Sequence, residues 1–207
     1  MELQPKKDST IDFLCVARQT SERFPNKIFA EIDGRPLISI IIEKLKIVNA
    51  GIIFAIPENN QNDKLCNYLI EKSIPVVRGS EDNVLDRFCK ASQYSDADFV
   101  QRVNCDNLLF DPDYFAQMHD IVRKNSEFSL FTNTQCANHS GQSVEIVRKD
   151  LCLSISKPSF HEQEHIFPYF YRTCKDKFDL PCPTQDVFPI DEPTDLENVI
   201  GSGIFGN

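Results

Sequence analysis

Three cations follow the first apolar segment of the sequence closely enough to bind one anion together. Arg18, Arg23 and Lys27 lie in the stretch RQTSERFPNK, directly after the apolar run 11–17. Arginine presents a planar fork to phosphate oxygens and lysine adds a point charge, so this stretch predicts a loop that wraps the phosphates of a nucleotide. A solvated basic loop without a ligand is the alternative. The sequence contains neither the Walker pattern G-x-x-x-x-G-K-[ST] nor the dinucleotide pattern G-x-G-x-x-G.

Two aspartates can supply oxygen ligands to a metal ion beside such phosphates. Asp106 follows the apolar stretch 98–103, and Asp191 ends the stretch VFPID, which we interpret as a late strand. Mg²⁺ is a hard cation that takes oxygen ligands and is usually shared with substrate phosphates. The alternatives are a turn stabilised by the Asp106 side chain and a helix start at Asp191.

A second acidic pair imitates a metal motif but has a structural explanation. Asp111 and Asp113 flank Pro112 and so reproduce the D-x-D motif of sugar-nucleotide glycosyltransferases. An aspartate directly before a proline is also a good N-cap for a helix. We therefore predict that Asp111 caps a helix.

Two histidines stand four residues apart in the stretch HEQEHIFPYFY. The spacing of His161 and His165 also occurs in zinc-binding helices, but no third ligand in a suitable context follows and Pro168 breaks the element. Contact with an acidic or hydroxylated substrate is the preferred interpretation. Packing of the neighbouring aromatic residues is the other.

Alternating apolar segments place these residues in an α/β fold. Short apolar runs predict strands, and longer segments with apolar residues on one side predict helices. Because such alternation is typical of a mostly parallel sheet, the loops after Ala17, Val77 and Val103 should meet at one rim, where ligands bind. Strands are expected at 13–17, 52–56, 74–77, 98–103, 128–132 and 144–147, and helices at 37–48, 59–72, 82–94, 111–124 and 193–200.

Composition sets the broad class. The 207 residues carry a net charge of −9, which argues against general affinity for nucleic acid or for anionic membranes. No apolar run is long enough for a membrane helix, and the N-terminus lacks the apolar region of a signal peptide. The eight cysteines include no C-x-x-C pair, so we expect reduced thiols in a cytoplasmic protein. Residues 1–10 are interpreted as a flexible lead, 11–200 as a single domain and 201–207 as a tail.

Five segments in this order resemble the cytidylyltransferases related to CMP-Kdo synthetase and CMP-sialate synthetase, and most of all the spore-coat polysaccharide SpsF type. The resemblance spans residues 11 to 200. The opening A-R-x-x-S-x-R-x-P-x-K, followed by G-x-P-L, matches 17–27 and 34–37; R-G-S-E-x-x-V-L-x-R matches 78–87; x-x-G-D-x-P-L-x-D-P matches 103–112; R-E-H-x-x-P-Y matches 163–169; and V-D-T-P-E-D-L-E matches 190–197.

The resemblance implies a Rossmann-like nucleotidyltransferase (GT-A-like) fold, a three-layer α/β/α arrangement with a mostly parallel sheet. It implies an enzyme that uses Mg²⁺ to transfer CMP from CTP to an acidic sugar or related acceptor, with release of pyrophosphate, for surface glycan biosynthesis. It also implies a homodimer, through the region 130–180.

Carried over residue by residue, the resemblance assigns roles to five sets of residues. Arg18, Lys27 and Asp106 would be catalytic. The triphosphate would contact Ala17, Arg18, Ser21, Arg23 and Lys27, and the cytidine end Arg78, Gly79, Ser80 and Asp82; Asp106 and Asp191 would hold Mg²⁺, and Glu164, His165 and Tyr169 would face the acceptor.

Four positions depart from the family pattern, mostly on the acceptor side. Cys105 stands in place of a glycine, Leu108 of a proline, Gln163 of an arginine and Ser143 of an aspartate. These departures keep open a noncatalytic nucleotide-binding module of the same fold. A glycosyltransferase that uses Asp111 as part of its metal motif is the other alternative, against which the basic loop argues.

Overall fold

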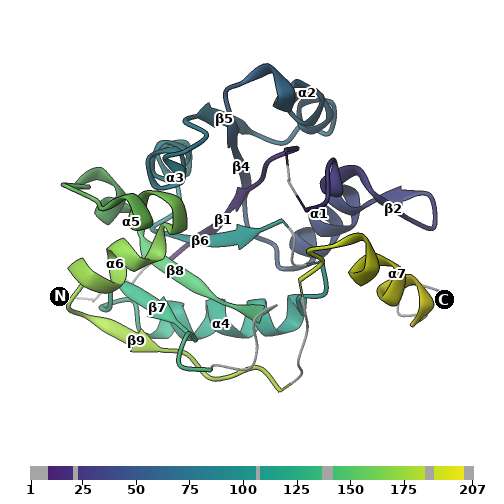
Figure 1. The fold of residues 1–207 in the computed structure, drawn as a ribbon. Helices are drawn as coiled ribbons and strands as arrows, with labels where there is room; N and C mark the ends of the chain where they lie inside the picture. The colour runs from purple at the N-terminus through teal and green to yellow at the C-terminus, as the bar shows by residue number, and fades with distance from the viewer. Residues whose placement is uncertain (1–8, 21–22, 106–107, 137–141, 185–188, 203–207) are drawn as a thin grey trace.

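The structure is a computed structural model that describes residues 9–20, 23–105, 108–136, 142–184 and 189–202. Its centre is a seven-stranded sheet of order β5-β4-β1-β6-β8-β7-β9 (Figure 1). The first four strands in that order run parallel, whereas β8 is antiparallel to both of its neighbours. The strands are β1 (Ile11–Val16), β4 (Ile52–Pro57), β5 (Val76–Gly79), β6 (Phe99–Asn104), β7 (Leu130–Thr132), β8 (Glu145–Arg148) and β9 (Lys177–Asp179), and β2 (Glu31–Ile32) and β3 (Arg35–Pro36) form a separate hairpin.

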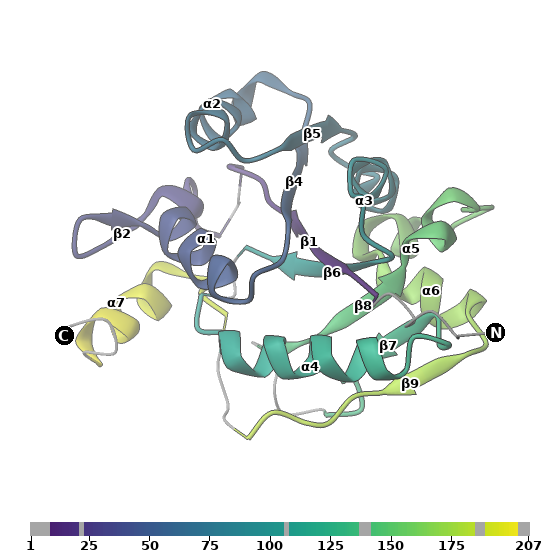
Figure 2. The same ribbon diagram turned by 180° about the vertical axis from the view of Figure 1, so that it is seen from behind.

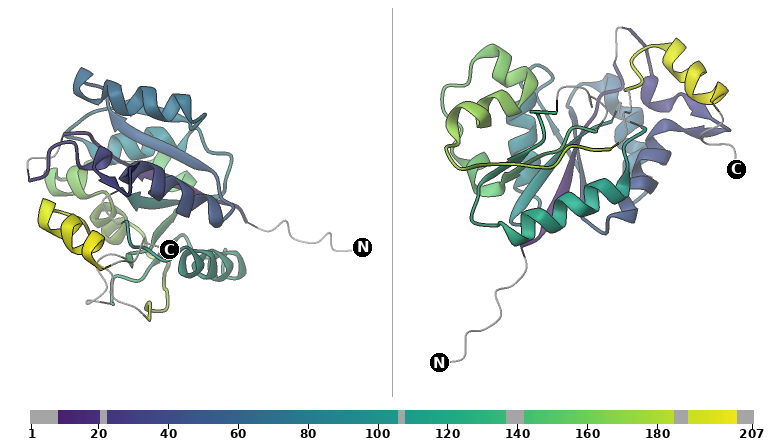
Figure 3. Two further views of the ribbon diagram at one scale, coloured as in Figure 1. Left: turned by 90° about the vertical axis from the view of Figure 1, so that its right-hand side faces the viewer. Right: turned by 90° about the horizontal axis from the view of Figure 1, so that it is seen from below.

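Helices cover both faces of this sheet. Successive residues of β1 point to opposite faces. Phe13 therefore packs in one core with α1 and α4, and Leu14 in a second core with α3 and α6. Figures 2 and 3 show α4 on one side of the sheet and α5 and α6 on the other. The helices are α1 (Leu37–Ile47), α2 (Asp63–Glu71), α3 (Val84–Ser92), α4 (Pro112–Lys124), α5 (Phe160–His165), α6 (Phe167–Thr173) and α7 (Pro193–Gly201).

The parallel strands end level with one another. Val16 at the end of β1 is paired with Ala55 of β4 and with Asn104 of β6, and Pro57 is paired with Gly79 of β5. The chain therefore leaves these four strands at one rim, as the sequence predicts. Ligands bind at this rim in open α/β sheets.

The N-terminal two thirds of the fold follow the predicted elements, with shifts of a few residues at their ends. Asp111 caps α4 as predicted, because its carboxylate accepts a 2.9 Å hydrogen bond from the Asp113 backbone amide. The residues Lys27–Phe29 form a 3-10 turn directly before β2.

The C-terminal third departs further from the prediction. The edge strand β9 was not expected; it pairs in parallel with β7 and is too short and polar to show a strand pattern. The late strand expected before Asp191 is wrong in the part that the structure describes, because Pro189, Ile190 and Asp191 form no strand. Whether these segments form strands depends on pairing with a neighbouring strand, which the local sequence does not encode.

Two of the eight cysteines are not free thiols. Cys136 follows β7 and Cys182 follows β9, and the two form a disulfide with Cα atoms 5.6 Å apart. The expectation of reduced thiols throughout is therefore wrong for this pair. The parallel pairing of β7 with β9 brings the two cysteines together across 46 residues. Within the described ranges, no helix has the length and apolar character needed to cross a membrane.

His119 on α4 gives the stability of the core a pH dependence. The ring is fully buried beside Phe13, and its Nε2 lies 2.7 Å from the Gln101 Oε1. Burial lowers the pKa of His119 from 6.5 to about 3. Below pH 6.5 the unfolded chain binds a proton at this ring and the folded chain does not. As the pH is lowered from 6.5 towards 3, the free energy of unfolding should therefore fall by about 1.4 kcal/mol per pH unit.

Urea unfolding across this pH range measures the effect. We expect the His119→Phe variant to lose that share of the slope, even where its absolute stability is lower because Gln101 has lost its partner. Equal slopes in the two proteins would contradict a neutral buried histidine.

Candidate active site

The loop after β1 opens directly into a pocket. Ala17 continues the pairing of β1 with β4, because its backbone amide donates a 3.3 Å hydrogen bond to the Ala55 carbonyl. The next residue, Arg18, is exposed. The pocket has a volume of about 500 Å³ and lies at the carboxyl ends of β1, β4 and β5. It is lined by Arg18, Gln19, Thr20, Pro25, Asn26, Gln61 and Glu81.

Arg18 is available to a ligand. No group in the described part of the chain accepts a hydrogen bond from its guanidinium or forms an ion pair with it. Its charge is felt by the buried Arg87, whose pKa is lowered to about 10 by burial and then by Arg18. The positive charge of Arg18 in the pocket, with the buried Arg87 near it, favours the binding of an anion there.

The other two cations of the loop are paired with one carboxylate. The Arg23 guanidinium lies 3.2 Å from Asp191, and the Lys27 ammonium lies 3.5 Å from the other oxygen of the same carboxylate. The tertiary structure thus brings Asp191 to the basic loop, although Asp191 and Lys27 are 164 positions apart in the sequence. Figure 1 shows α7, which follows Asp191, beside β2 and α1.

Asp191 is not needed to start α7. Glu192 is the N-cap, and the Asp195 carboxylate accepts hydrogen bonds of 2.8 Å from the backbone amides of Asp191 and Glu192. The helix start is therefore satisfied by other side chains, and the Asp191 carboxylate points to the basic loop. Among the described residues, no group of three His, Cys, Asp or Glu side chains is placed to hold a metal ion. Asp106, the other predicted metal ligand, and Ser21 lie outside the described residues.

The residues expected at the cytidine end lie at the end of β5. Arg78 is held there by protein groups, since its guanidinium donates to the Asn59 carbonyl at 2.6 Å and pairs with Asp63 at 2.7 Å. The Ser80 hydroxyl accepts a 3.0 Å hydrogen bond from the Asn83 amide, which shapes the turn into α3. Gly79 is close-packed, because a Cβ there would lie 3.3 Å from the side chain of Arg87. Asp82 is exposed on the same turn.

Sequence reasoning missed two residues that shape this pocket, Glu81 and Arg87. Arg87 on α3 is buried and donates hydrogen bonds to the backbone carbonyls of Ser80 and Glu81, the latter at 3.3 Å. Its signal was the final arginine of the stretch RGSEDNVLDR, which we assigned to no role. Glu81 lines the pocket and accepts hydrogen bonds from Asn59 and Thr20. It thus links the loop after β5 to the loops after β4 and β1.

Lys44 of α1 contacts the segment that leads from β6 into α4. The ammonium donates a 2.8 Å hydrogen bond to the Leu108 carbonyl and lies 4.8 Å from the centre of the Phe110 ring. Burial lowers the pKa of Lys44 to about 8. This contact holds the segment that leads from β6 into α4.

The residues expected to face an acceptor lie in a separate group on α5 and α6. Glu164 and His165 are exposed. Tyr169 is buried, and its hydroxyl accepts a 2.9 Å hydrogen bond from the Ser156 amide. The rings of His161 and His165 lie 4.5 Å apart, with no third metal ligand beside them in the described part of the chain.

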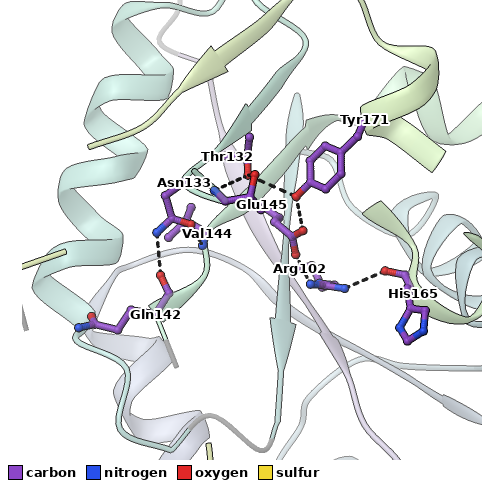
Figure 4. A network of polar contacts seen from close by, with 9 residues as sticks. Arg102, Thr132, Asn133, Gln142, Val144, Glu145, His165 and Tyr171 are labelled. Carbon is purple, nitrogen blue, oxygen red and sulfur yellow. Dashed lines mark hydrogen bonds and ion pairs between the residues drawn. The ribbon is translucent and has the colours of Figure 1, made fainter. Parts of the chain in front are cut away.

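A buried polar network joins α6 to the sheet next to this group (Figure 4). Arg102 of β6 pairs with Glu145 of β8, and its guanidinium also donates a 3.0 Å hydrogen bond to the His165 carbonyl. The Tyr171 hydroxyl donates to Glu145 and lies 3.3 Å from the Thr132 hydroxyl. Burial and the neighbouring carboxylate raise the pKa of Tyr171. The network fixes α6 against β7 and β8 at the end of β6.

Comparisons with known proteins identify the family of this chain. A family model described as cytidylyltransferase matches residues 13–185, most of the chain. The chain belongs to the cytidylyltransferase family.

The relatives of this cytidylyltransferase chain are similar at moderate identity. An uncharacterised protein of Methanocaldococcus jannaschii is 29% identical over 162 residues, 75% of this chain and 64% of that protein. The spore coat polysaccharide biosynthesis protein SpsF of Bacillus subtilis is 27% identical, over 76% of this chain and 68% of SpsF. A 3-deoxy-manno-octulosonate cytidylyltransferase of Colwellia psychrerythraea is 25% identical, over 59% of this chain and 44% of that enzyme. The chain thus spans about two thirds or less of the length of these relatives.

The fold agrees with this family. A solved cytidylyltransferase structure from Leptospira borgpetersenii superposes with a TM-score of 0.82 over 96% of this chain and 88% of that one, at 22% sequence identity. The predicted α/β nucleotidyltransferase fold, with its mostly parallel mixed sheet, is therefore confirmed.

Proposed function

We propose that this protein transfers CMP from CTP to an acidic sugar or related acceptor and releases pyrophosphate, in the synthesis of a surface glycan. The observation that carries the proposal is the Arg18 guanidinium, which has no partner among the described residues, in a pocket of about 500 Å³ at the sheet rim of a cytidylyltransferase-family chain. The names of the SpsF and 3-deoxy-manno-octulosonate relatives support a glycan and an acidic sugar, respectively.

The reaction is an in-line displacement at phosphorus. An acceptor oxygen forms a bond to the α-phosphorus, the bond to the bridging oxygen of pyrophosphate breaks, and the acceptor hydroxyl loses its proton to solvent. The protein contributes alignment and charge neutralisation more than covalent chemistry. Arg18 and Lys27 offset the charge that builds on the leaving pyrophosphate, and Ala17, Ser21 and Arg23 complete the phosphate loop.

Binding of the triphosphate requires an exchange of ion pairs. Arg23 and Lys27 leave the Asp191 carboxylate for phosphate oxygens, and Asp191 and Asp106 are then the residues that would hold Mg²⁺. When bound, Mg²⁺ polarises the α-phosphate. The donor set fits this ion because both side chains are carboxylates, and the remaining ligands come from the substrate phosphates and water.

The Asp191→Asn variant tests this exchange. We expect the Mg²⁺ concentration for half-maximal activity to rise by about 10–100-fold, the range seen when a metal site loses one supporting contact. Stability without ligand should fall as well, because the largely buried Lys27 loses a carboxylate partner, whereas the mostly exposed Arg23 contributes little. An unchanged Mg²⁺ requirement would remove Asp191 from the metal site.

The acceptor side rests on Glu164, His165 and Tyr169. Glu164 and His165 are exposed, and the His165 carbonyl accepts a hydrogen bond from Arg102, which supports the proposal that they contact a polar acceptor. Tyr169 supports this layer through its contact with Ser156. We expect a homodimer formed through the region 130–180, and light scattering on the purified protein measures its mass.

Pyrophosphate release tests the proposal. Each nucleoside triphosphate is incubated with Mg²⁺, the protein and a panel of acidic sugars; we expect release with CTP alone, and no release from the Asp106→Asn variant. Thermal stabilisation by CTP and Mg²⁺ without turnover on any acceptor would indicate the noncatalytic module instead. Absence of stabilisation at millimolar CTP would overturn the nucleotide site itself.

A further inference from the structure

Among the described residues that line the pocket, which also include the cationic Arg18, Glu81 is the one that carries a carboxylate. A negative charge repels a triphosphate, so its presence there needs a compensating role. In the described part of the chain, no lysine or arginine forms an ion pair with the Glu81 carboxylate. Its partners are two neutral donors, the Thr20 hydroxyl at 3.3 Å on Oε1 and the Asn59 amide at 2.5 Å on Oε2.

These contacts leave Glu81 able to accept more hydrogen bonds. An ionised carboxylate has about four lone-pair positions, of which the structure fills two with protein donors. The Glu81 residue is exposed and lines the pocket, so the remaining positions are accessible to a ligand. A ligand group that fits must donate hydrogen bonds without carrying negative charge.

The position of Glu81 is fixed by the fold. Arg87 is buried on α3 and holds the backbone carbonyls of Ser80 and Glu81. Gly79 lets this arginine approach the backbone, since a Cβ would sit 3.3 Å from its side chain. Asn59 is in turn fixed by Asn62, whose amide donates a 2.7 Å hydrogen bond to the Asn59 side chain. The carboxylate is thus held by a rigid frame, as discrimination between similar ligands requires.

We infer that Glu81 selects cytosine over uracil by accepting a hydrogen bond from the 4-amino group of the base. This inference rests on the proposed function, which supplies the nucleoside triphosphate. Carboxylates accept from the cytosine 4-amino group, whereas uracil presents a carbonyl oxygen at the same position. Two acceptors then face each other in a pocket, and the loss of a hydrogen bond combines with repulsion. With the phosphates on Arg18, the base end of the nucleotide extends along the pocket towards Glu81.

The Glu81→Gln variant tests the inference by binding, independently of turnover. The carboxamide keeps the shape of the side chain and adds an N–H donor that suits the 4-oxygen of uracil. We measure the affinities of CTP, UTP and a cytidine triphosphate analogue without the 4-amino group, for the wild type and for this variant. The wild type should prefer CTP over both others by at least about 10-fold, the discrimination of one good base contact. In the variant the preference over UTP should fall by about 10-fold or more.

The controls separate the possible failures. Glu71→Gln removes an exposed carboxylate at the end of α2, outside the pocket, and should keep the wild-type preference. If the wild type binds CTP, and the preference over UTP survives Glu81→Gln, the inference is overturned while the proposed function stands. If the wild type binds none of the three nucleotides, the proposed function fails. Equal binding of CTP and the analogue to the wild type also overturns the role of Glu81, even where the variant folds poorly.

Discussion

Replacing Arg18 by methionine should lower kcat/KM for CTP by about 10²–10³-fold, or about 2.7–4 kcal/mol of transition-state stabilisation. The reason is that Arg18 would lose its contacts with the triphosphate, which carries the charge that grows as pyrophosphate leaves. Stability should not fall, because no described residue accepts a hydrogen bond from Arg18 and its charge lowers the pKa of the buried Arg87. We expect an unfolding midpoint equal to or slightly above that of the wild type, measured alongside pyrophosphate release.

Two further variants serve as a control outside the pocket and as a test of charge against side-chain shape. Arg35→Met removes an arginine that pairs with Glu43 on the surface and lies outside the pocket, so kcat/KM should remain at the wild-type value. Arg18→Lys keeps the charge and loses the planar fork, and should fall between wild type and Arg18→Met. Activity of Arg18→Met within about twofold of the wild type would exclude Arg18 from the phosphate site.

Replacing Glu145 by leucine should lower the free energy of unfolding by about 3–5 kcal/mol. This carboxylate is 6% exposed and pairs with Arg102, which is 17% exposed, so the change leaves a guanidinium buried without its counter-charge. The Tyr171 hydroxyl loses its acceptor as well. Chemical denaturation of the wild type and the variant measures the difference.

The double variant Arg102→Met with Glu145→Leu tells charge from packing. Replacement of both members of a buried ion pair by apolar residues is often close to neutral, so the double variant should recover much of the loss. The pair Asp120 and Arg123 on the surface of α4 is the matched control, and Asp120→Asn should cost about 1 kcal/mol or less. A loss from Glu145→Leu as small as that of the control would contradict the buried network.

Local signals in the sequence predicted most of the sheet and the place of the phosphate loop. The apolar run of β1 followed at once by Arg18 required no distant information, because a buried strand and its exit loop are adjacent in the chain. The cap of α4 at Asp111 is similarly local, since an N-cap bonds to amides two or three residues away. β9 carries no such pattern, because its pairing with β7 depends on a segment distant in sequence.

The candidate site was predicted in its residue types and only partly in its arrangement. The sequence indicated that Arg23, Lys27 and Asp191 belong to one rim, but their pairing in the absence of ligand came from the structure. Glu81 and Arg87 were missed. A buried arginine on a helix has no periodic or capping signal that separates it from a surface arginine, and the contacts of Glu81 with Thr20 and Asn59 join segments distant in the chain. The disulfide between Cys136 and Cys182 was missed for a related reason, since spacing alone does not determine which cysteines pair.

The sequence by itself determined that this chain is an α/β protein with a basic loop at the end of its first strand, and its motifs indicated the family. Those features depend on periodicity, capping and residue type over a few positions. Only the tertiary structure decided which carboxylate faces the basic loop, that Glu81 enters the pocket, and that Arg102 is buried against Glu145. Each of these contacts joins segments far apart in the chain, and its geometry exists only after the sheet has fixed their positions.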